Sequence, residues 1–217
     1  MTDLETRLLA LDTSCLCDAK KTLRVLNSDI CPLVPGLKMV GRAFTVSCCD
    51  DILRVLRALR EAAPGDVLIV DGQGGRKALA GELFTTEARR RGLAGMVVDG
   101  AVRDVATIRT LGFPIYARSV TPMAGSSRSL SSTAIPVSCG GVTVVPGDFV
   151  IGDDDGVVVA SEAEIEAILP AAEQIQHTEA DALRRMAAGE SLMDLLNVQE
   201  HLDALAAGRP SQLRFLI

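Results

Sequence analysis

Three side chains of this chain have the types and the spacing needed for chemistry on a small carboxylic acid. Glu82 is followed 21 positions later by Arg103, and Asp104 comes next. A carboxylate can hold a hard cation such as Mg²⁺, and a guanidinium can grip a carboxylate or a developing enolate. A second acid can position a water that carries a proton. The combination predicts a metal-dependent site at which an enolate forms.

Each of these residues also has an ordinary structural explanation. Glu82 falls near the start of an expected helix, where an acid interacts favourably with the helix dipole. Arg103 and Asp104 can form surface contacts at the start of the next helix. The free N–H groups at a helix start also favour anions, so a substrate carboxylate could dock there. The three residues together, more than any one of them, favour the functional interpretation.

The elements around these residues indicate how they are positioned. A strand is expected to end at Asp71, followed by the glycine-rich loop 72–76, a helix that ends near Gly92, and a buried strand over 96–98. A strand, a helix and a strand in this order imply a parallel crossover, and ligands gather at the carboxyl ends of such strands. The glycine-rich loop lacks the spacing of a dinucleotide fingerprint or a P-loop.

The rest of the chain gives weaker signals. Apolar spacing predicts a helix over 14–26, and the segments 142–145 and 149–151 suggest an antiparallel hairpin. A turn over 153–156 leads to a further strand. A capping box at 161–164 predicts a long C-terminal helix with a break at Gly189 and a second helical stretch over 191–207.

Composition limits the classes of function. The chain has 217 residues, 48% of them apolar, and a net charge of −6, which argues against a nucleic-acid partner. No uncharged apolar run approaches the roughly 20 residues of a membrane span. The six cysteines include no C-x-x-C pair, so zinc is disfavoured and reduced thiols are expected. A cytoplasmic protein without a membrane partner is the expectation.

The segments around Glu82 and Arg103 resemble the RraA-like family, which contains regulators of ribonuclease E and class II pyruvate aldolases. The resemblance extends over roughly residues 12–165 and includes Gly-Arg-Ala-Phe-Thr at 41–45, Pro-Gly-Asp at 64–66 and Asp-Asp-Asp-Gly-Val-Val at 153–158. It implies one domain over 1–217 with an α/β fold, a swivelling β/β/α-type sandwich with mixed sheets and C-terminal helices. It also implies a homotrimer or hexamer, with the extension 161–207 packing at a subunit interface.

The resemblance also implies a role for each site residue. Asp104 would hold Mg²⁺ or Mn²⁺, and Arg103 would bind the pyruvyl group and stabilise its enolate. Backbone amides of Gly81, Glu82 and Leu83 would complete the carboxylate site. Glu82 would order the water that protonates the enolate. An acid at position 82 marks the aldolase branch, although those aldolases carry Asp there.

The activity implied is cleavage of 4-hydroxy-2-oxo acids, such as 4-hydroxy-4-methyl-2-oxoglutarate or 4-carboxy-4-hydroxy-2-oxoadipate, to pyruvate. Oxaloacetate decarboxylation would accompany it, because loss of CO₂ gives the same enolate. An acid from a neighbouring subunit, with Glu190 and Glu200 as candidates, would close the site. Two alternatives remain open at this stage. One is a regulatory protein that binds a ribonuclease without catalysis, and the other is a sugar-acid lyase or dehydratase on the same scaffold.

Overall fold

Two runs of apolar residues form the centre of the molecule. The computed structural model describes residues 2–129 and 132–217. Residues 67–70 and 96–98 are buried along their whole length in two neighbouring parallel strands, β4 (Asp66–Asp71) and β6 (Gly95–Val102). Strands that are covered on both faces have continuously apolar sequences. The predicted crossover is present, with α4 (Glu82–Arg90) as its helix.

The other strands extend this pair into a curled, mixed sheet. Within the described residues the strand order is β1-β11-β10-β3-β4-β6-β7-β2, and β5 pairs with β6. The pairs β3/β4, β4/β6, β6/β7 and β5/β6 are parallel, whereas the outer pairs are antiparallel. The remaining strands of the sheet are β1 (Arg24–Val25), β2 (Cys31–Pro32), β3 (Met39–Ser47), β5 (Ala78–Ala80), β7 (Ile115–Val120), β10 (Phe149–Asp153) and β11 (Gly156–Ala160). A separate hairpin joins β8 (Val137–Cys139) to β9 (Val142–Val144).

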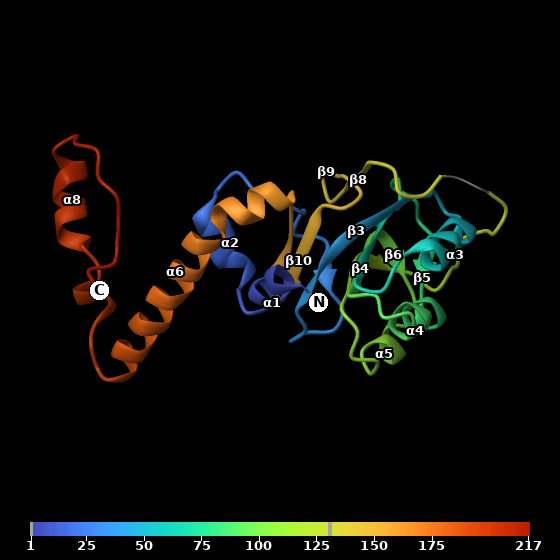
Figure 1. Ribbon diagram of the computed structural model, residues 1–217, viewed down its shortest axis with the longest axis horizontal. Helices are drawn as coiled ribbons and strands as arrows, with labels where there is room; N and C mark the ends of the chain where they lie inside the picture. The colour runs from blue at the N-terminus through green and yellow to red at the C-terminus, as the bar shows by residue number, and fades with distance from the viewer. Residues whose placement is uncertain (1, 130–131) are drawn as a thin grey trace.

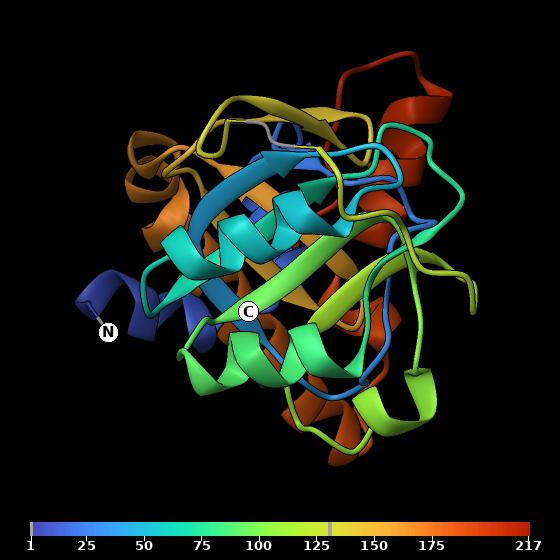
Figure 2. The same ribbon diagram turned by 90° about the vertical axis from the view of Figure 1, so that its right-hand side faces the viewer.

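Helices and the small hairpin cover the sheet. The helices α3 (Ile52–Glu61), α4 and the short α5 (Val105–Ile108) lie on one side of the central strands, as the cyan and green ribbons of Figure 2 show. The hairpin β8–β9 packs on the other face, around Ile69 and Tyr116. At the far end of the sheet α1 (Asp3–Leu9), α2 (Thr13–Ala19) and the first turns of α6 (Glu162–Ala187) cover β10 and β11.

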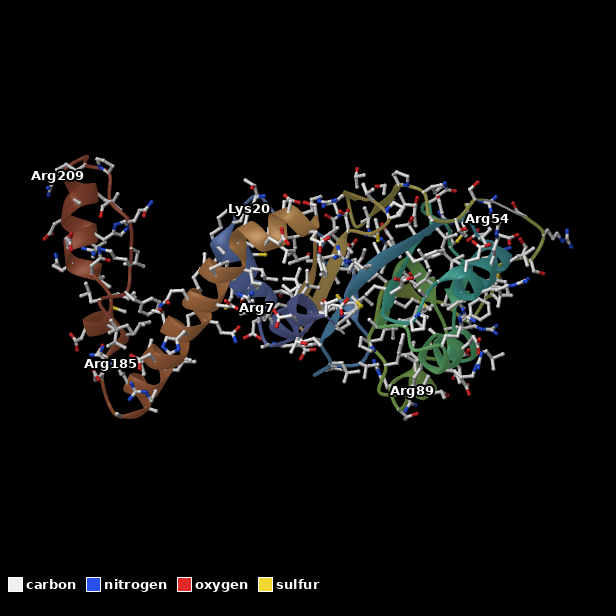
Figure 3. All side chains as sticks on the ribbon, viewed as in Figure 1. Arg7, Lys20, Arg54, Arg89, Arg185 and Arg209 are labelled. Atoms are coloured by element: carbon white, nitrogen blue, oxygen red, sulfur yellow. The ribbon has the colours of Figure 1, made fainter. Side chains whose placement is uncertain are left out.

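The C-terminal helices form an arm that leaves the body of the molecule (Figure 1). The helix α6 has 26 residues, which corresponds to a length of about 39 Å. Its first half is anchored by Ile165 and Leu169, whereas Leu183 in its second half is 66% exposed. The helices α7 (Leu192–Leu195) and α8 (Val198–Ala206) follow at the far end. In Figure 3 Arg185 and Arg209 mark this arm, far from Arg54 and Arg89 on the opposite side.

Two expectations about local structure were wrong. The helix expected over 14–26 ends at Ala19, and β1 follows and pairs with β11. The apolar Leu23 and Leu26 are buried, but in two different clusters beside the sheet. Their spacing therefore reflects packing against the sheet and not the face of a helix. The expected hairpin of 142–145 with 149–151 is absent: β9 pairs with β8, and β10 lies between β3 and β11. Asp148 closes the intervening turn by accepting a 2.9 Å hydrogen bond from Val145 N.

The described helices include none that combines the length and the low charge required to cross a lipid bilayer.

The start of α6 generates a prediction about stability. Glu164 accepts hydrogen bonds from Lys20 Nζ at 2.8 Å and from Ser161 N at 3.0 Å, which together lower the pKa of Glu164 to about 2. Because the folded-state pKa is depressed, this stabilisation is present above the ordinary pKa of 4.5 and is lost as the pH falls towards 2. Glu164→Gln should therefore lower the free energy of unfolding at pH 7, and its difference from wild type should shrink by pH 3.

Urea unfolding between pH 7 and pH 3 measures this difference, with Glu166→Gln on the same helix as the control. A difference between Glu164→Gln and wild type that is independent of pH would contradict this account of how α6 is anchored.

Candidate active site

The predicted chemical residues meet where β5 and β6 end side by side. These two strands are parallel, and the chain passes from β5 directly into α4 and from β6 directly into α5. Arg103 N donates a 3.0 Å hydrogen bond to Ala80 O, which carries the pairing one residue past the end of β6. The positions around 81 and 103 are thereby fixed next to each other although 20 residues separate Glu82 from Arg103.

Asp104 has an uncommon backbone conformation. Its φ of 59° and ψ of 33° lie in the left-handed region, which Asp and Asn tolerate better than most side chains. Asp104 is the N-terminal cap of α5, yet its side chain makes no capping hydrogen bond to that helix. Its carboxylate instead accepts a 3.2 Å hydrogen bond from Glu82 N, so it lies at the start of α4. Non-glycine residues held in this region occur often at functional sites.

Arg103 and Asp104 form a partly exposed ion pair. Arg103 Nε lies 3.4 Å from Asp104 Oδ2, and the two side chains are 41% and 38% exposed. Because the contact is long and made by one nitrogen only, both groups keep donors and acceptors for a ligand. The pair combines a fixed cation with a carboxylate at the N-terminal end of a helix.

Gly81 allows this close arrangement. A Cβ atom at this position would lie 2.6 Å from Asp104 Oδ2 and 2.9 Å from Arg103 Cγ. The backbone of Gly81 is extended and would suit any residue, so the glycine serves to leave space for the side chains of Asp104 and Arg103 as they are placed here. Thr85 holds the backbone of Gly81 in place, since Thr85 N and Oγ1 both donate to Gly81 O, at 3.0 and 2.9 Å.

A small pocket opens beside this ion pair. Its walls combine Arg103 and Asp104 with apolar residues from β5, α3, α4 and the loop after β7. The lining residues are Ile52, Ala78, Leu79, Ala80, Gly81, Leu83, Phe84, Arg103, Asp104 and Ala124. Its volume of about 40 Å³ is far below the 300 Å³ or more of pockets that enclose a ligand. The pocket by itself is therefore too small to enclose a substrate, and a molecule bound there would extend beyond it.

The structure brings most of the predicted site residues together. Gly81, Leu83, Arg103 and Asp104 all line the pocket, and Leu83 is 73% exposed at its edge. The half-buried side chain of Glu82 does not line the pocket. Glu82 contacts the site through its backbone N–H, which donates to the carboxylate of Asp104.

The two C-terminal acids do not reach this pocket within the same chain. Glu190 is paired with Arg185 on the arm, and Glu200 lies 3.7 Å from Arg214.

The apolar walls of the pocket have no signal in the sequence. Ala78 and Ala124 are joined by a parallel bridge between β5 and the loop after β7, and Ile52 comes from the first turn of α3. None of these residues has a reactive group, so only the three-dimensional structure associates them with Arg103.

The carboxylate oxygens of Asp104 suit a hard cation that is held by few protein groups. Among residues 2–129 and 132–217, no three His, Cys, Asp or Glu side chains gather closely enough to hold a metal ion. Mg²⁺ is commonly held by one or two carboxylates and keeps several of its waters. The half-exposed carboxylate of Asp104, with a single backbone donor, is compatible with that kind of binding.

Comparison with known proteins identifies relatives of this chain. The RraA-like family, described as Aldolase/RraA, matches residues 13–159. A protein of Halalkalibacterium halodurans named "Putative 4-hydroxy-4-methyl-2-oxoglutarate aldolase" is 38% identical over 193 residues, which are 88% of this chain and 91% of that protein.

Solved structures share the fold. Streptomyces coelicolor RraAS2, described as an unusual member of the RNase ES inhibitor RraA protein family, aligns with a TM-score of 0.73 and 31% identity over 86% of this chain and 97% of its own. An uncharacterized protein from Pseudomonas syringae aligns with a TM-score of 0.79 and 25% identity over 88% and 91% of the two chains. The α/β fold with a mixed sheet and C-terminal helices, expected from the sequence, is confirmed.

The contact of Gly81 with Asp104 predicts a measurable coupling. Gly81→Ala forces Asp104 and Arg103 to move, and overpacking of this kind costs about 1–3 kcal/mol. In an Asp104→Ala background the nearest clashing oxygen is gone, so the same substitution should destabilise less, by at least about 0.5 kcal/mol. A double-mutant cycle of denaturant unfolding measures this coupling. Strictly additive effects would mean that Gly81 and Asp104 are not in contact.

Proposed function

This chain belongs to the RraA-like family, and from that premise we propose that it is a divalent-metal-dependent aldolase that cleaves 4-hydroxy-2-oxo acids to pyruvate. The substrate class includes 4-hydroxy-4-methyl-2-oxoglutarate, the compound in the name of the Halalkalibacterium halodurans relative. The observation that carries the proposal is the Arg103–Asp104 pair at the start of α4, with Gly81 leaving room for both side chains.

In this proposal Arg103 binds the common end of every substrate. Its planar guanidinium presents several donors, which match a carboxylate and the neighbouring 2-oxo oxygen in a way that the single ammonium group of Lys does not. The free N–H groups at the start of α4, around Gly81 and Leu83, bind the same carboxylate. The two sets of donors together hold the 2-oxo acid in one orientation against the apolar wall of the pocket.

Asp104 is the residue that would hold Mg²⁺ or Mn²⁺, alongside water molecules. A bound divalent cation supplies Lewis-acid polarisation of the 2-oxo group. The 4-hydroxyl gives its proton to a water molecule, C4 becomes a carbonyl carbon as the C3–C4 bond breaks, and the electron pair of that bond becomes the enolate of pyruvate. Arg103 stabilises the negative charge that develops on the 2-oxo oxygen. The side chain of Glu82 does not line the pocket, so its role is indirect: it orders the water that returns this proton to C3, which completes pyruvate.

Decarboxylation of oxaloacetate is expected as a side activity. When C4 of oxaloacetate leaves as CO₂, the equivalent C3–C4 bond breaks and the same enolate remains, so the same contacts of Arg103 stabilise it. The part of the substrate beyond C4 differs between the two reactions. Substitutions of the residues around Arg103 should therefore lower the rates of both reactions equally.

The activity should depend on the metal and on Arg103. Pyruvate release from 4-hydroxy-4-methyl-2-oxoglutarate should be lost in EDTA and restored by Mg²⁺ or Mn²⁺, as measured with a pyruvate-coupled assay. Arg103→Ala should lower kcat/KM by about 100-fold or more, because it removes a contact that is strongest in the transition state. Arg89→Ala, on the exposed end of α4, is the matched control and should leave the rate unchanged.

Undiminished turnover by Arg103→Ala would exclude this site. A wild-type protein that releases no pyruvate with any of these substrates and metals, but that binds a ribonuclease, would instead favour a regulatory role. That role has a basis in the similarity to the inhibitor-family protein of Streptomyces coelicolor.

We propose further that the protein is a homotrimer or hexamer in which the arm packs on a neighbouring subunit. The pocket is open on one side and is bordered by the exposed Leu83, and the arm exposes Leu183, Leu202, Leu205 and other large apolar side chains. Apolar surface that is spread along a projecting arm is typical of contacts between subunits. An acid from the neighbouring arm, Glu190 or Glu200, would then close the site.

Charged substitutions on the arm should weaken this assembly. Leu202→Glu combined with Leu205→Glu places two carboxylates on the exposed side of α8 and should shift the protein towards smaller species in sedimentation velocity. Leu56→Glu, at an exposed position of α3, is the control and should leave the mass unchanged. A wild-type protein that sediments as a monomer at micromolar concentration would contradict the proposal.

A further inference from the structure

Asp51 accepts more hydrogen bonds than its position requires. It is the N-terminal cap of α3, and its Oδ1 accepts the usual capping bond from Leu53 N at 3.0 Å. Its Oδ2 accepts three others, from Ser126 Oγ at 2.9 Å, Arg128 N at 2.8 Å and Ser129 N at 3.0 Å. The residue is only 4% exposed. A helix cap needs one such bond, so the other three serve the segment from which they come.

That segment is the loop after β7, and it is also bound to β5. Ala78 N donates to Met123 O at 2.7 Å, and Gly125 N donates to Ala78 O at 3.0 Å. The backbone of Ser126 exchanges a further pair of 2.7 Å bonds, with Asp50 O and with Ile52 N.

Close packing confirms how tightly the loop is held. A Cβ atom at Gly125 would lie 2.6 Å from Asp50 O, so the loop and the start of α3 are in direct backbone contact.

These contacts build one wall of the candidate active site. Ile52, Ala78 and Ala124 line the pocket that also contains Arg103 and Asp104. Each of the three comes from a different segment. The side-chain bonds of Asp51, together with the backbone bonds of Ser126, join the loop to the start of α3. No other described side chain contributes three acceptor contacts to this loop.

We propose that Asp51 is a positioning residue of the site: by gathering the donors of residues 126–129, its carboxylate fixes the apolar wall that faces the Arg103–Asp104 pair. Asp51 does not touch the substrate in this arrangement. The consequence for a 2-oxo acid rests on the function proposed above, whereas the consequence for the loop does not. The wall confines the apolar carbons of the substrate while Arg103 holds its carboxylate.

The ionisation of Asp51 is compatible with this role. Burial alone would raise the pKa of Asp51, but the hydrogen bonds from Arg128, Ser126, Leu53 and Ser129 outweigh burial and lower it below the ordinary value. A buried carboxylate is tolerated where several donors satisfy it. The charged form, which accepts all four bonds, is therefore the form present at neutral pH.

The test uses Asp51→Ser in the full-length protein. Serine is a good helix cap, so α3 is preserved, but one short hydroxyl cannot accept all three loop donors. Asp153→Ser is the matched control, because Asp153 is also buried and accepts three bonds, from Thr13 N and Oγ1 at 2.7 Å each and from Asp155 N at 3.0 Å. None of these control residues lines the pocket.

Two measurements distinguish positioning from general stability. Asp51→Ser should raise the KM for the 2-oxo acid by about tenfold and change kcat much less, as expected for the loss of a buried hydrogen-bond set. The amides of Gly125, Ser126, Arg128 and Ser129 should lose protection in hydrogen exchange. Asp153→Ser should change neither, although both variants lower the melting temperature.

The outcomes separate this inference from the proposed function. A wild-type protein without lyase activity would refute the proposed function. Hydrogen exchange of the loop would still decide the role of Asp51 in that case. Unchanged loop protection in Asp51→Ser, or an equal rise of KM in Asp153→Ser, would overturn the inference. If Asp51→Ser does not fold, Ser126→Ala decides instead: a KM rise of about two- to threefold supports the role, and an unchanged KM and unchanged exchange refute it.

Discussion

The site depends on the parallel pairing of β5 with β6 and on the hydrogen bond from Arg103 N to Ala80 O that prolongs it. This backbone contact fixes the end of β6 against the start of α4. A Cβ atom at position 81 would meet the side chains of Asp104 and Arg103, so glycine there leaves room for both of them. The left-handed conformation of Asp104 then turns its carboxylate towards Glu82 N and away from the helix that it caps. The left-handed backbone of Asp104 and its close contact with Gly81 together hold a carboxylate and a guanidinium at the N-terminal end of α4.

Asp104 differs from three acids of low exposure in how its oxygens are used. Asp51, Asp99 and Asp153 have low exposure and are satisfied by backbone N–H groups and by side chains such as that of Arg118. Their lone pairs are engaged in holding loops together, and their role is structural or positional. Asp104 is 38% exposed and accepts one backbone hydrogen bond, so it keeps acceptor sites for a cation and its waters. This contrast distinguishes Asp104 from Asp51, Asp99 and Asp153, although all four residues are aspartates.

Much of this arrangement could be predicted from the sequence, because the informative residues have distinct chemistry. The apolar runs of β4 and β6, the crossover helix and the capping box at Ser161 each have a local signal, and each is present. The strand β5 has only three residues, two of them alanines with weak strand propensity, and its pairing with β6 exists only in the folded chain.

The hairpin β8–β9 and the early end of α2 were missed for the same physical reason. Local apolar spacing does not reveal which distant surface a residue packs on, and tertiary packing decided the structure of these segments. The role of Asp51 was likewise hidden, since a helix cap and a loop clamp use the same residue type.

The most direct test of the central claim is a titration with Mn²⁺ in the presence of pyruvate, followed by the electron paramagnetic resonance signal of free Mn²⁺. The proposed site predicts that the wild-type protein binds one Mn²⁺ per chain and that Asp104→Asn, which preserves the shape of the side chain but removes its charge, binds far more weakly. Equal binding by wild type and Asp104→Asn would contradict the claim that this carboxylate anchors the metal.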